Sequence, residues 1–239
     1  MTSLLAAEES VIPHHTQVTV AGLTFNLDTI WSTLVAGAIV VALGLYMRSR
    51  ITHGVPSKLQ LLWEVVVEAV ETQVRTAIGP VAPFVVPLAV TLFFFILIAN
   101  YLELIPTMHY LPPPTGDVNL PAAMAVFVIV LVHVTGIRKR GAGNYFKHFL
   151  QPFPVMLPFN IVEEIAKPIS LSLRLFGNIF ASTIMLSVIA FLFPFYIVPV
   201  PNIAWKLFAL FIGAMQAFIF ALLTIIYFGF AVGGAEEEH

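Results

Sequence analysis

An arginine stands in the middle of an apolar segment long enough to cross a bilayer, within residues 170–178 (SLSLRLFGN). An arginine at the centre of a membrane-spanning helix costs about 2.5 to 3.5 kcal/mol, so such a residue marks a candidate functional site. Arginine stays protonated in proteins and therefore cannot pass protons by titrating. It can repel a proton or another cation, and it lowers the pKa of a carboxylate that comes close. Arg174 is thus suited to act as a barrier and as the partner of a carboxylate.

Polar residues recur around Arg174 at intervals of three and four, the spacing that places side chains on one face of a helix. They are Glu163 or Glu164, Lys167, Ser170, Arg174, Asn178 and Ser182. The last apolar segment carries Gln216, which we expect beside Arg174 in an antiparallel hairpin. Glu163 and Glu164 lie about two to three helical turns from Arg174, so neither is an obvious partner at its depth. We therefore expect the partner carboxylate on another subunit.

A second group of polar residues follows the second apolar segment. It contains Asn100 and Glu103, with His109, Asp117 and Asn119 in the next loop. We expect the two groups to reach into the membrane from opposite sides, with Arg174 between them.

The composition indicates an integral membrane protein with a single domain, residues 1–239. Hydrophobic residues make up 59% of the chain and charged residues 10%, whereas soluble domains carry about 25% charged residues. The chain has no cysteine, which excludes a thiol site. Its net charge of -2 gives no positive field that would attract nucleic acid. No glycine-rich phosphate loop is present, and we expect no metal or cofactor.

The apolar segments and the helical spacing of the polar residues predict that helices position these residues. We therefore expect an all-α integral membrane protein. In chain order we expect an outside N-terminal segment (1–26), a first span (27–47), an amphipathic surface helix (57–77), a helical hairpin of two spans (81–137), a hairpin of two long, strongly tilted helices carrying Arg174 (158–232) and an acidic cytoplasmic tail (233–239).

The last two helices are too long to stand upright in a membrane. Residues 158–193 would form about 54 Å of helix, against a hydrocarbon core of about 30 Å. This helix either tilts steeply or breaks near Pro168. The basic residues set the orientation, because four of the 11 Lys and Arg residues lie between the first two spans and four follow the third. The positive-inside rule then predicts an outside N-terminus and a cytoplasmic C-terminus.

Two motifs resemble those of subunit a of the F-type ATP synthase membrane sector, and the span count resembles its bacterial members. They are RLFGN at 174–178 and QAFIF at 216–220, with Lys167-Pro168 upstream. The likeness extends to His14-His15, residues 100–106, residues 117–119 and residues 151–153. It implies a proton-translocating stator subunit, not catalytic on its own, in the bacterial plasma membrane. The implied partners are the ring of c subunits, b-type peripheral stalk subunits, the remainder of the ATP synthase and membrane lipid.

The same resemblance implies residue roles. Arg174 matches the essential arginine that meets the ring carboxylate between two offset half-channels, with Asn178 and Gln216 as its polar neighbours. Asn100 and Glu103 match residues of the outer half-channel, and Lys167 and Ser170 match positions near the cytoplasmic exit. A proton would pass from outside to a ring carboxylate, ride almost a full turn and leave into the cytoplasm.

Two positions depart from the pattern of many bacterial members. Thr183 stands where they have a glutamate, nine residues after the arginine, and Ala209 stands where they have a histidine, seven residues before Gln216. We expect Glu163 or Glu164, if the fold brings them near, or water alone, to complete the path there.

Two other functional classes compete with this reading. A secondary transporter could bind an anion at Arg174, but it predicts an inverted repeat and paired broken helices, and neither is visible. An intramembrane enzyme could use Glu163, Glu164 and His133 as metal ligands, but the His-Glu-x-x-His spacing is absent. For His133 we favour a structural hydrogen bond.

Overall fold

Helices make up nearly all of the described part of this computed structural model, which covers residues 17–20, 23–50, 57–78, 84–102, 113–148 and 153–233. The predicted all-α membrane architecture is confirmed. One short antiparallel ribbon precedes the first span, formed by β1 (Gln17–Val20) and β2 (Leu23–Asn26). Its valines, threonines and phenylalanine favour extended backbone. The sequence reading assigned no structure to this segment.

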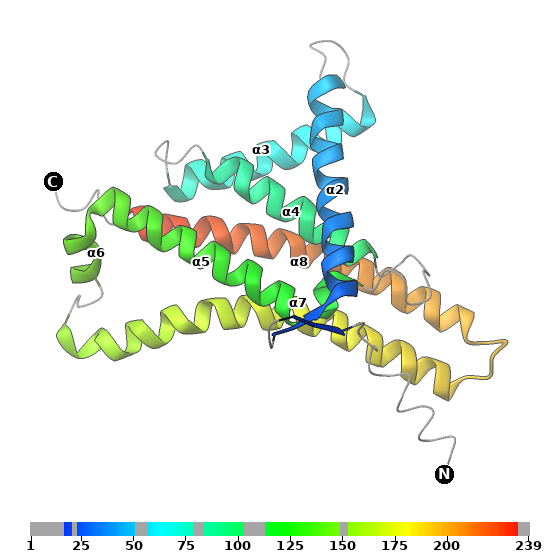
Figure 1. The fold of residues 1–239 in the computed structure, drawn as a ribbon. Coiled ribbons are helices and arrows are strands. Elements are labelled where there is room, and N and C mark those ends of the chain that lie inside the picture. Colours follow the sequence, from blue (N-terminus) through cyan, green and yellow to red (C-terminus); the bar gives the residue numbers. More distant parts are fainter. Residues whose placement is uncertain are drawn as a thin grey trace.

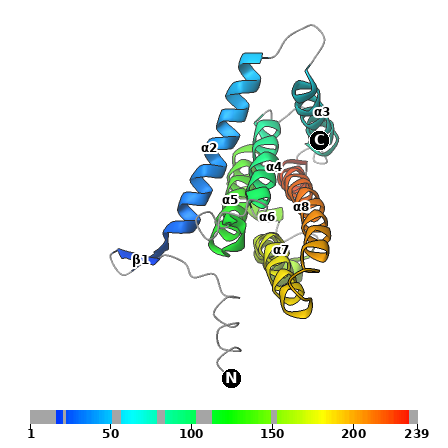
Figure 2. The same ribbon diagram turned by 90° about the vertical axis from the view of Figure 1, so that its right-hand side faces the viewer.

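The first span and the amphipathic helix run in different directions. Helix α2 (Leu27–Arg50) has 24 residues, about 36 Å, and ends in Arg48 and Arg50. Helix α3 (Lys58–Ile78) runs across the direction of α2 at the C-terminal end of α2 (Figures 1 and 2). Its buried residues Val70 and Val74 pack into the core, as expected for a helix with one apolar face.

Helices α4 (Val85–Tyr101) and α5 (Asn119–Arg140) follow, with the short helix η3 (Pro114–Gly116) before α5. Both α4 and α5 pack against α8. The 17 residues of α4 give about 25 Å, which is shorter than the second apolar segment suggested. Among the helices described, four are long and apolar enough to cross a membrane: α2, α5, α7 and α8. Gly141, with φ of 77°, ends α5.

The last two helices form a long antiparallel hairpin. After α6 (Ala142–His148) and η4 (Pro154–Met156), α7 (Leu157–Leu192) and α8 (Pro199–Gly233) run 36 and 35 residues. Helix α7 continues through Pro168 without a break and is bowed (Figure 1). Both helices lie across the direction of α2 in Figure 1, and α7 is seen nearly end-on in Figure 2. The hairpin is therefore steeply inclined to the first span.

The core lies where α3, α4, α5, α7 and α8 meet. Its fully buried side chains include Ile96 of α4, Val128 of α5, Leu175 of α7 and Phe228 of α8. Helix α8 packs against each of the other four, so it holds the bundle together. Large apolar side chains remain exposed along α7 and α8, as expected for surfaces that face lipid or another membrane protein.

Candidate functional site

Arg174 lies halfway along α7, on the side that points away from the core. Its neighbours Leu171 and Leu175 are buried at 1% and 0% exposure, whereas Leu173 is 56% exposed. Arg174 is also exposed. Among the hydrogen bonds and ion pairs between described residues, none involves Arg174. The guanidinium is therefore presented to whatever lies outside this chain.

The polar stripe predicted on α7 turns around the helix. Ser170 and Arg174 are exposed, Asn178 is half-buried and Ser182 is buried. A four-residue step advances about 400°, or about 40° past a full turn, so three steps rotate the stripe by about 120°. The stripe thus passes from the free surface at Arg174 to the bundle interior at Ser182.

The contact between Lys167 and Tyr227 indicates which residues of α7 and α8 lie level with each other. The Lys167 Nζ atom stands 5.7 Å from the centre of the Tyr227 ring, so these two residues lie side by side across the hairpin. Arg174 is seven residues after Lys167, and Phe220 is seven residues before Tyr227. Because the two helices are antiparallel, Arg174 is about level with Phe220. Gln216 is then level with Asn178. Gln216 is buried at 6% exposure, and no hydrogen bond between these described residues joins it to Arg174.

One end of the α7–α8 hairpin carries a set of charged and titratable groups, here named the basic-end cluster because it lies near Arg138–Arg140. Its members are His133, Tyr145, Glu163, Glu164, Lys167 and Tyr227. The Lys167 ammonium forms an ion pair with Glu164 and lies 3.5 Å from Glu163 Oε1. The His133 Nε2 atom lies 3.7 Å from Glu164 Oε2. The cluster therefore joins α5, α6, α7 and α8.

Tyr145 and Tyr227 are members of this cluster that sequence reasoning missed. Tyr227 lies within electrostatic reach of Lys167, Glu164 and Arg174. Tyr227 stands 11 residues after Gln216, which is about three helical turns, so both residues lie on one face of α8. This spacing in the sequence could have identified Tyr227 as a member of the polar face. Burial raises the pKa of the Tyr145 hydroxyl above 10.0, Glu164 raises it further and Arg140 opposes the shift. Tyr145 therefore stays protonated near neutral pH.

The other polar region, here named the Asp117 cluster, joins α2, α4, η3 and α8. Its members are Asn26, Thr29, Asn100, Thr115 and Asp117. The Asn100 amide donates to the Gly213 carbonyl at 3.1 Å, and its oxygen accepts from Thr115 at 2.9 Å. The buried Asp117 carboxylate accepts from Asn26 at 2.7 Å and Thr29 at 2.8 Å. Asn100 thus lies in a buried polar network.

Glu103 and His109 lie outside the described residues. So do the N-terminal histidines and the acidic tail from residue 234. The Thr183 hydroxyl donates to the Ile179 carbonyl of its own helix at 3.0 Å. Glu163 and Glu164 do not come near Thr183, because 19 residues of continuous helix, about 28 Å, separate Glu164 from Thr183. The suggestion that these glutamates fill in for the missing side chain at Thr183 is therefore wrong.

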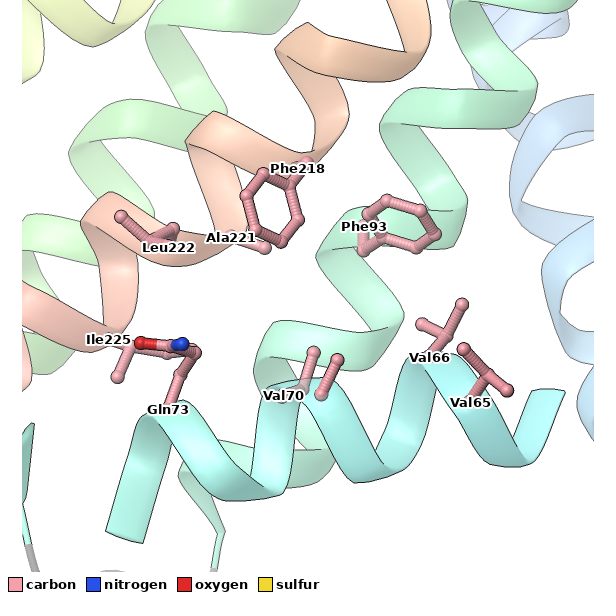
Figure 3. A pocket seen from close by; sticks show the side chains of 10 residues that line it. Val65, Val66, Val70, Gln73, Phe93, Phe218, Ala221, Leu222 and Ile225 are labelled. Carbon is pink, nitrogen blue, oxygen red and sulfur yellow. The ribbon is translucent and has the colours of Figure 1, made fainter. Parts of the chain in front are cut away.

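A pocket of about 110 Å³ lies between α3, α4 and α8 (Figure 3). Figure 3 shows Val70, Phe93 and Phe218 around it, and the polar side chain among those that line it is Gln73. These side chains cannot bind or transfer a proton, so the pocket is no part of the polar path. Within the part of the chain that the structure describes, no group of three or more His, Asp or Glu side chains is placed to hold a metal ion.

Comparison with known proteins gives the family. The family model described as ATP synthase A chain matches residues 29–229. Proteins named ATP synthase subunit a from Acidothermus cellulolyticus and Mycobacterium marinum are each 49% identical to this chain. Both alignments cover 99% of this chain, with 89% of the first relative and 99% of the second. One from Moorella thermoacetica is 39% identical over 86% of this chain and 92% of its own length. The chain therefore belongs to the ATP synthase A chain family.

Proposed function

We propose that this chain is the proton-conducting stator subunit of a bacterial F-type ATP synthase, and that Arg174 faces a carboxylate on a rotating ring of c subunits. As a member of the ATP synthase A chain family, it is a non-catalytic subunit of the membrane sector Fo that takes part in proton translocation. The finer assignment, which concerns Arg174 and the half-channels, rests on the geometry.

The observation that carries this proposal is the exposed Arg174 on an otherwise apolar surface. Ile169, Leu173 and Phe180, which lie around it on α7, are 53%, 56% and 52% exposed. A charge facing lipid from such a surface is costly unless an opposite charge meets it. A Cβ atom built at Gly177 meets no described atom within 4 Å, which leaves room for a partner helix to approach. A carboxylate on another subunit satisfies both observations.

We assign the inner half-channel to the basic-end cluster. Glu163 is exposed, and the Lys167 side chain is 15% exposed. Lys167 and Ser170 lie on α7 between these glutamates and Arg174. This order makes a polar route from the ring-facing surface to the water at the basic end. A proton released beside Arg174 would leave by this route, because the arginine lowers the pKa of the ring carboxylate that faces it.

We assign the outer half-channel to the other side of Arg174. Asn100 lines it from α4, and Glu103 follows it by three residues in the sequence. Gln216 and Asn178 lie between Asn100 and Arg174 along the hairpin. The buried hydroxyl of Ser182 adds a polar group on α7. The two half-channels are then offset along α7, with the positive charge of Arg174 preventing direct passage between them.

Orientation and partners complete the proposal. The basic ends of α2 and α5 face the cytoplasm and the N-terminus lies outside, by the positive-inside rule. The ring docks on the exposed side of the α7–α8 hairpin. Subunits of a b-type peripheral stalk hold the chain still against the ring, and lipid covers the remaining apolar surface. The protein is then a multi-pass protein of the bacterial plasma membrane.

The test uses the complete ATP synthase in inverted membrane vesicles. Arg174→Ala is expected to abolish ATP-driven proton pumping, measured by quenching of an acridine dye, while the detached catalytic head still hydrolyses ATP. Leu173→Ala, the adjacent exposed residue, is the matched control and is expected to pump at the wild-type rate. Normal pumping by an assembled Arg174→Ala complex would refute the proposal.

A further inference from the structure

We propose that His133 is a proton-carrying residue of the inner half-channel, where it shares one exchangeable proton with Glu164. This inference rests on the proposed function, since it adds a residue to the same path. Three observations carry it: the fixed tautomer of the His133 ring, the position of Glu164 opposite the free ring nitrogen, and the partial exposure of both side chains.

The backbone of α5 fixes the tautomer of the ring. The His133 Nδ1 atom lies 2.8 Å from the Ile129 carbonyl oxygen. A carbonyl oxygen can only accept, so Nδ1 carries the hydrogen of this bond. In the neutral ring the lone pair is then on Nε2. The structural hydrogen bond expected from the sequence is present, and it leaves the second nitrogen free to take up a proton.

The free nitrogen faces a carboxylate. Nε2 lies 3.7 Å from Glu164 Oε2, which is within ion-pair range and close enough for a small side-chain rotation or one bridging water. The other oxygen of Glu164 is held by the Lys167 ammonium, which leaves Oε2 to face the imidazole. Nε2 takes a proton from an incoming hydronium or water chain and becomes an imidazolium paired with Glu164. Release of the same proton to cytoplasmic water restores the neutral ring.

Charged and titratable groups of four helices surround His133. They are Tyr145 of α6, Glu163, Glu164 and Lys167 of α7, Tyr227 of α8, and the basic residues Arg138–Arg140 of α5. Histidine commonly carries protons in proteins by accepting and releasing one at a ring nitrogen, and His133 is the histidine in the basic-end cluster.

Neither side chain is enclosed by the described part of the chain. The side chains of His133 and Glu164 are 31% and 25% exposed. The Tyr145 ring packs edge-on to the His133 ring at 6.0 Å and is itself 5% exposed. One side of the imidazole is thus held by Tyr145, while the Nε2 side remains open toward Glu164. We assign the water of the inner half-channel to this open side.

The experiment measures the pH dependence of ATP-driven proton pumping by the whole complex in inverted vesicles, between about pH 5.5 and 8.5. His133→Gln, which keeps a donor for the Ile129 carbonyl, is expected to lower the pumping rate about tenfold. It is also expected to remove the inflection that the wild type shows within this range. Glu164→Gln is expected to shift the same inflection to lower pH, because the anion that stabilises the imidazolium is lost. The double variant is expected to pump no more slowly than His133→Gln alone, because the two residues act as a unit.

The matched control is Thr135→Val, which removes a hydroxyl that donates to the Leu131 carbonyl of the same helix at 2.7 Å. It is expected to keep the wild-type rate and pH profile. A His133→Gln complex with the wild-type rate and profile would overturn the inference. If His133→Gln does not assemble, an unchanged pH profile in Glu164→Gln would overturn it as well. Arg174→Ala separates the two proposals. Normal pumping by the Arg174→Ala complex refutes the proposed function. If Arg174→Ala blocks pumping but His133→Gln leaves the pumping rate and pH profile unchanged, only the role of His133 is refuted.

Discussion

Asp117 is a buried carboxylate that fastens α5 and η3 to the start of the first span. It is 8% exposed and accepts hydrogen bonds from the side chains of Asn26 and Thr29 and from the backbone of Asn119 at 3.0 Å. Asp117→Ala leaves these donors unpaired in a buried place. It is expected to lower the free energy of unfolding by about 2 to 4 kcal/mol. Thermal unfolding of the purified protein in detergent, followed by circular dichroism, measures the loss.

Asp117→Asn is the graded control for this prediction. Asn26 and Thr29 donate to the same oxygen, Oδ2, and an asparagine oxygen placed there can accept from both. Its amide group would then face the Asn119 N–H, where a donor meets a donor. The loss should therefore fall between wild type and Asp117→Ala. Equal stability of all three proteins would show that the carboxylate does not hold these elements together.

At the residue scale, the sequence could identify groups on one helix but not their partners on others. Helical spacing alone placed Lys167 three residues from Glu164, and the ion pair is present. The contacts of Glu164 with His133 and of Lys167 with Tyr227 join separate helices. They depend on how the helices align, which residue spacing along one chain segment does not specify. The expected place of Gln216 beside Arg174 also depends on this alignment, and no hydrogen bond between the described residues joins the two.

Gly213 lets α4 and α8 approach closely at Asn100. A Cβ atom at Gly213 would lie 3.2 Å from the Asn100 Cβ, and the Gly213 carbonyl is the acceptor of the Asn100 amide. Gly213→Val must push the helices apart and weaken this bond. The matched control is Gly37→Val in α2, where no described atom lies within 4 Å of an added Cβ.

Both variants replace a helical glycine by valine, so the change in helix propensity is the same in each. The difference between their unfolding free energies therefore measures the cost of the clash at Gly213. Gly213→Val is expected to be less stable than Gly37→Val by about 2 kcal/mol, in the same detergent unfolding experiment. The proton-pumping rate of the Gly213→Val complex should also fall, because Asn100 moves. If the two variants unfold at the same temperature, the close approach of α4 and α8 does not depend on a glycine.

At the element scale, hydrophobic length predicted the helices well. The two helices expected to be too long for an upright span are 36 and 35 residues long. The alternatives at Pro168 were a tilt or a break, and the helix is continuous and bowed. A proline removes one hydrogen bond to the residue four positions earlier, which bends a helix without ending it when the neighbouring helices hold it. Those neighbours are a tertiary feature that the sequence did not reveal.

At the scale of the whole molecule, the decisive feature is which side of the α7–α8 hairpin remains uncovered. Helices α3, α4 and α5 cover one side of it, whereas Arg174, Ile169, Leu173 and Phe180 of α7 are exposed. Hydropathy alone cannot distinguish the sides of α7, because buried and exposed positions are equally apolar in a membrane protein. The sequence therefore predicted that Arg174 needs an outside partner, and the fold supplies the open surface on which that partner would dock.

The most direct measurement of the central claim is photo-crosslinking within the assembled ATP synthase, from a light-reactive phenylalanine analogue in place of Leu173. Leu173 adjoins Arg174 and is 56% exposed, whereas Leu171, the control position, is 1% exposed. The proposal predicts a covalent product with the c subunit from position 173, identified by mass spectrometry, and none from position 171. An assembled complex that yields no product with the c subunit from position 173 would contradict a ring facing Arg174.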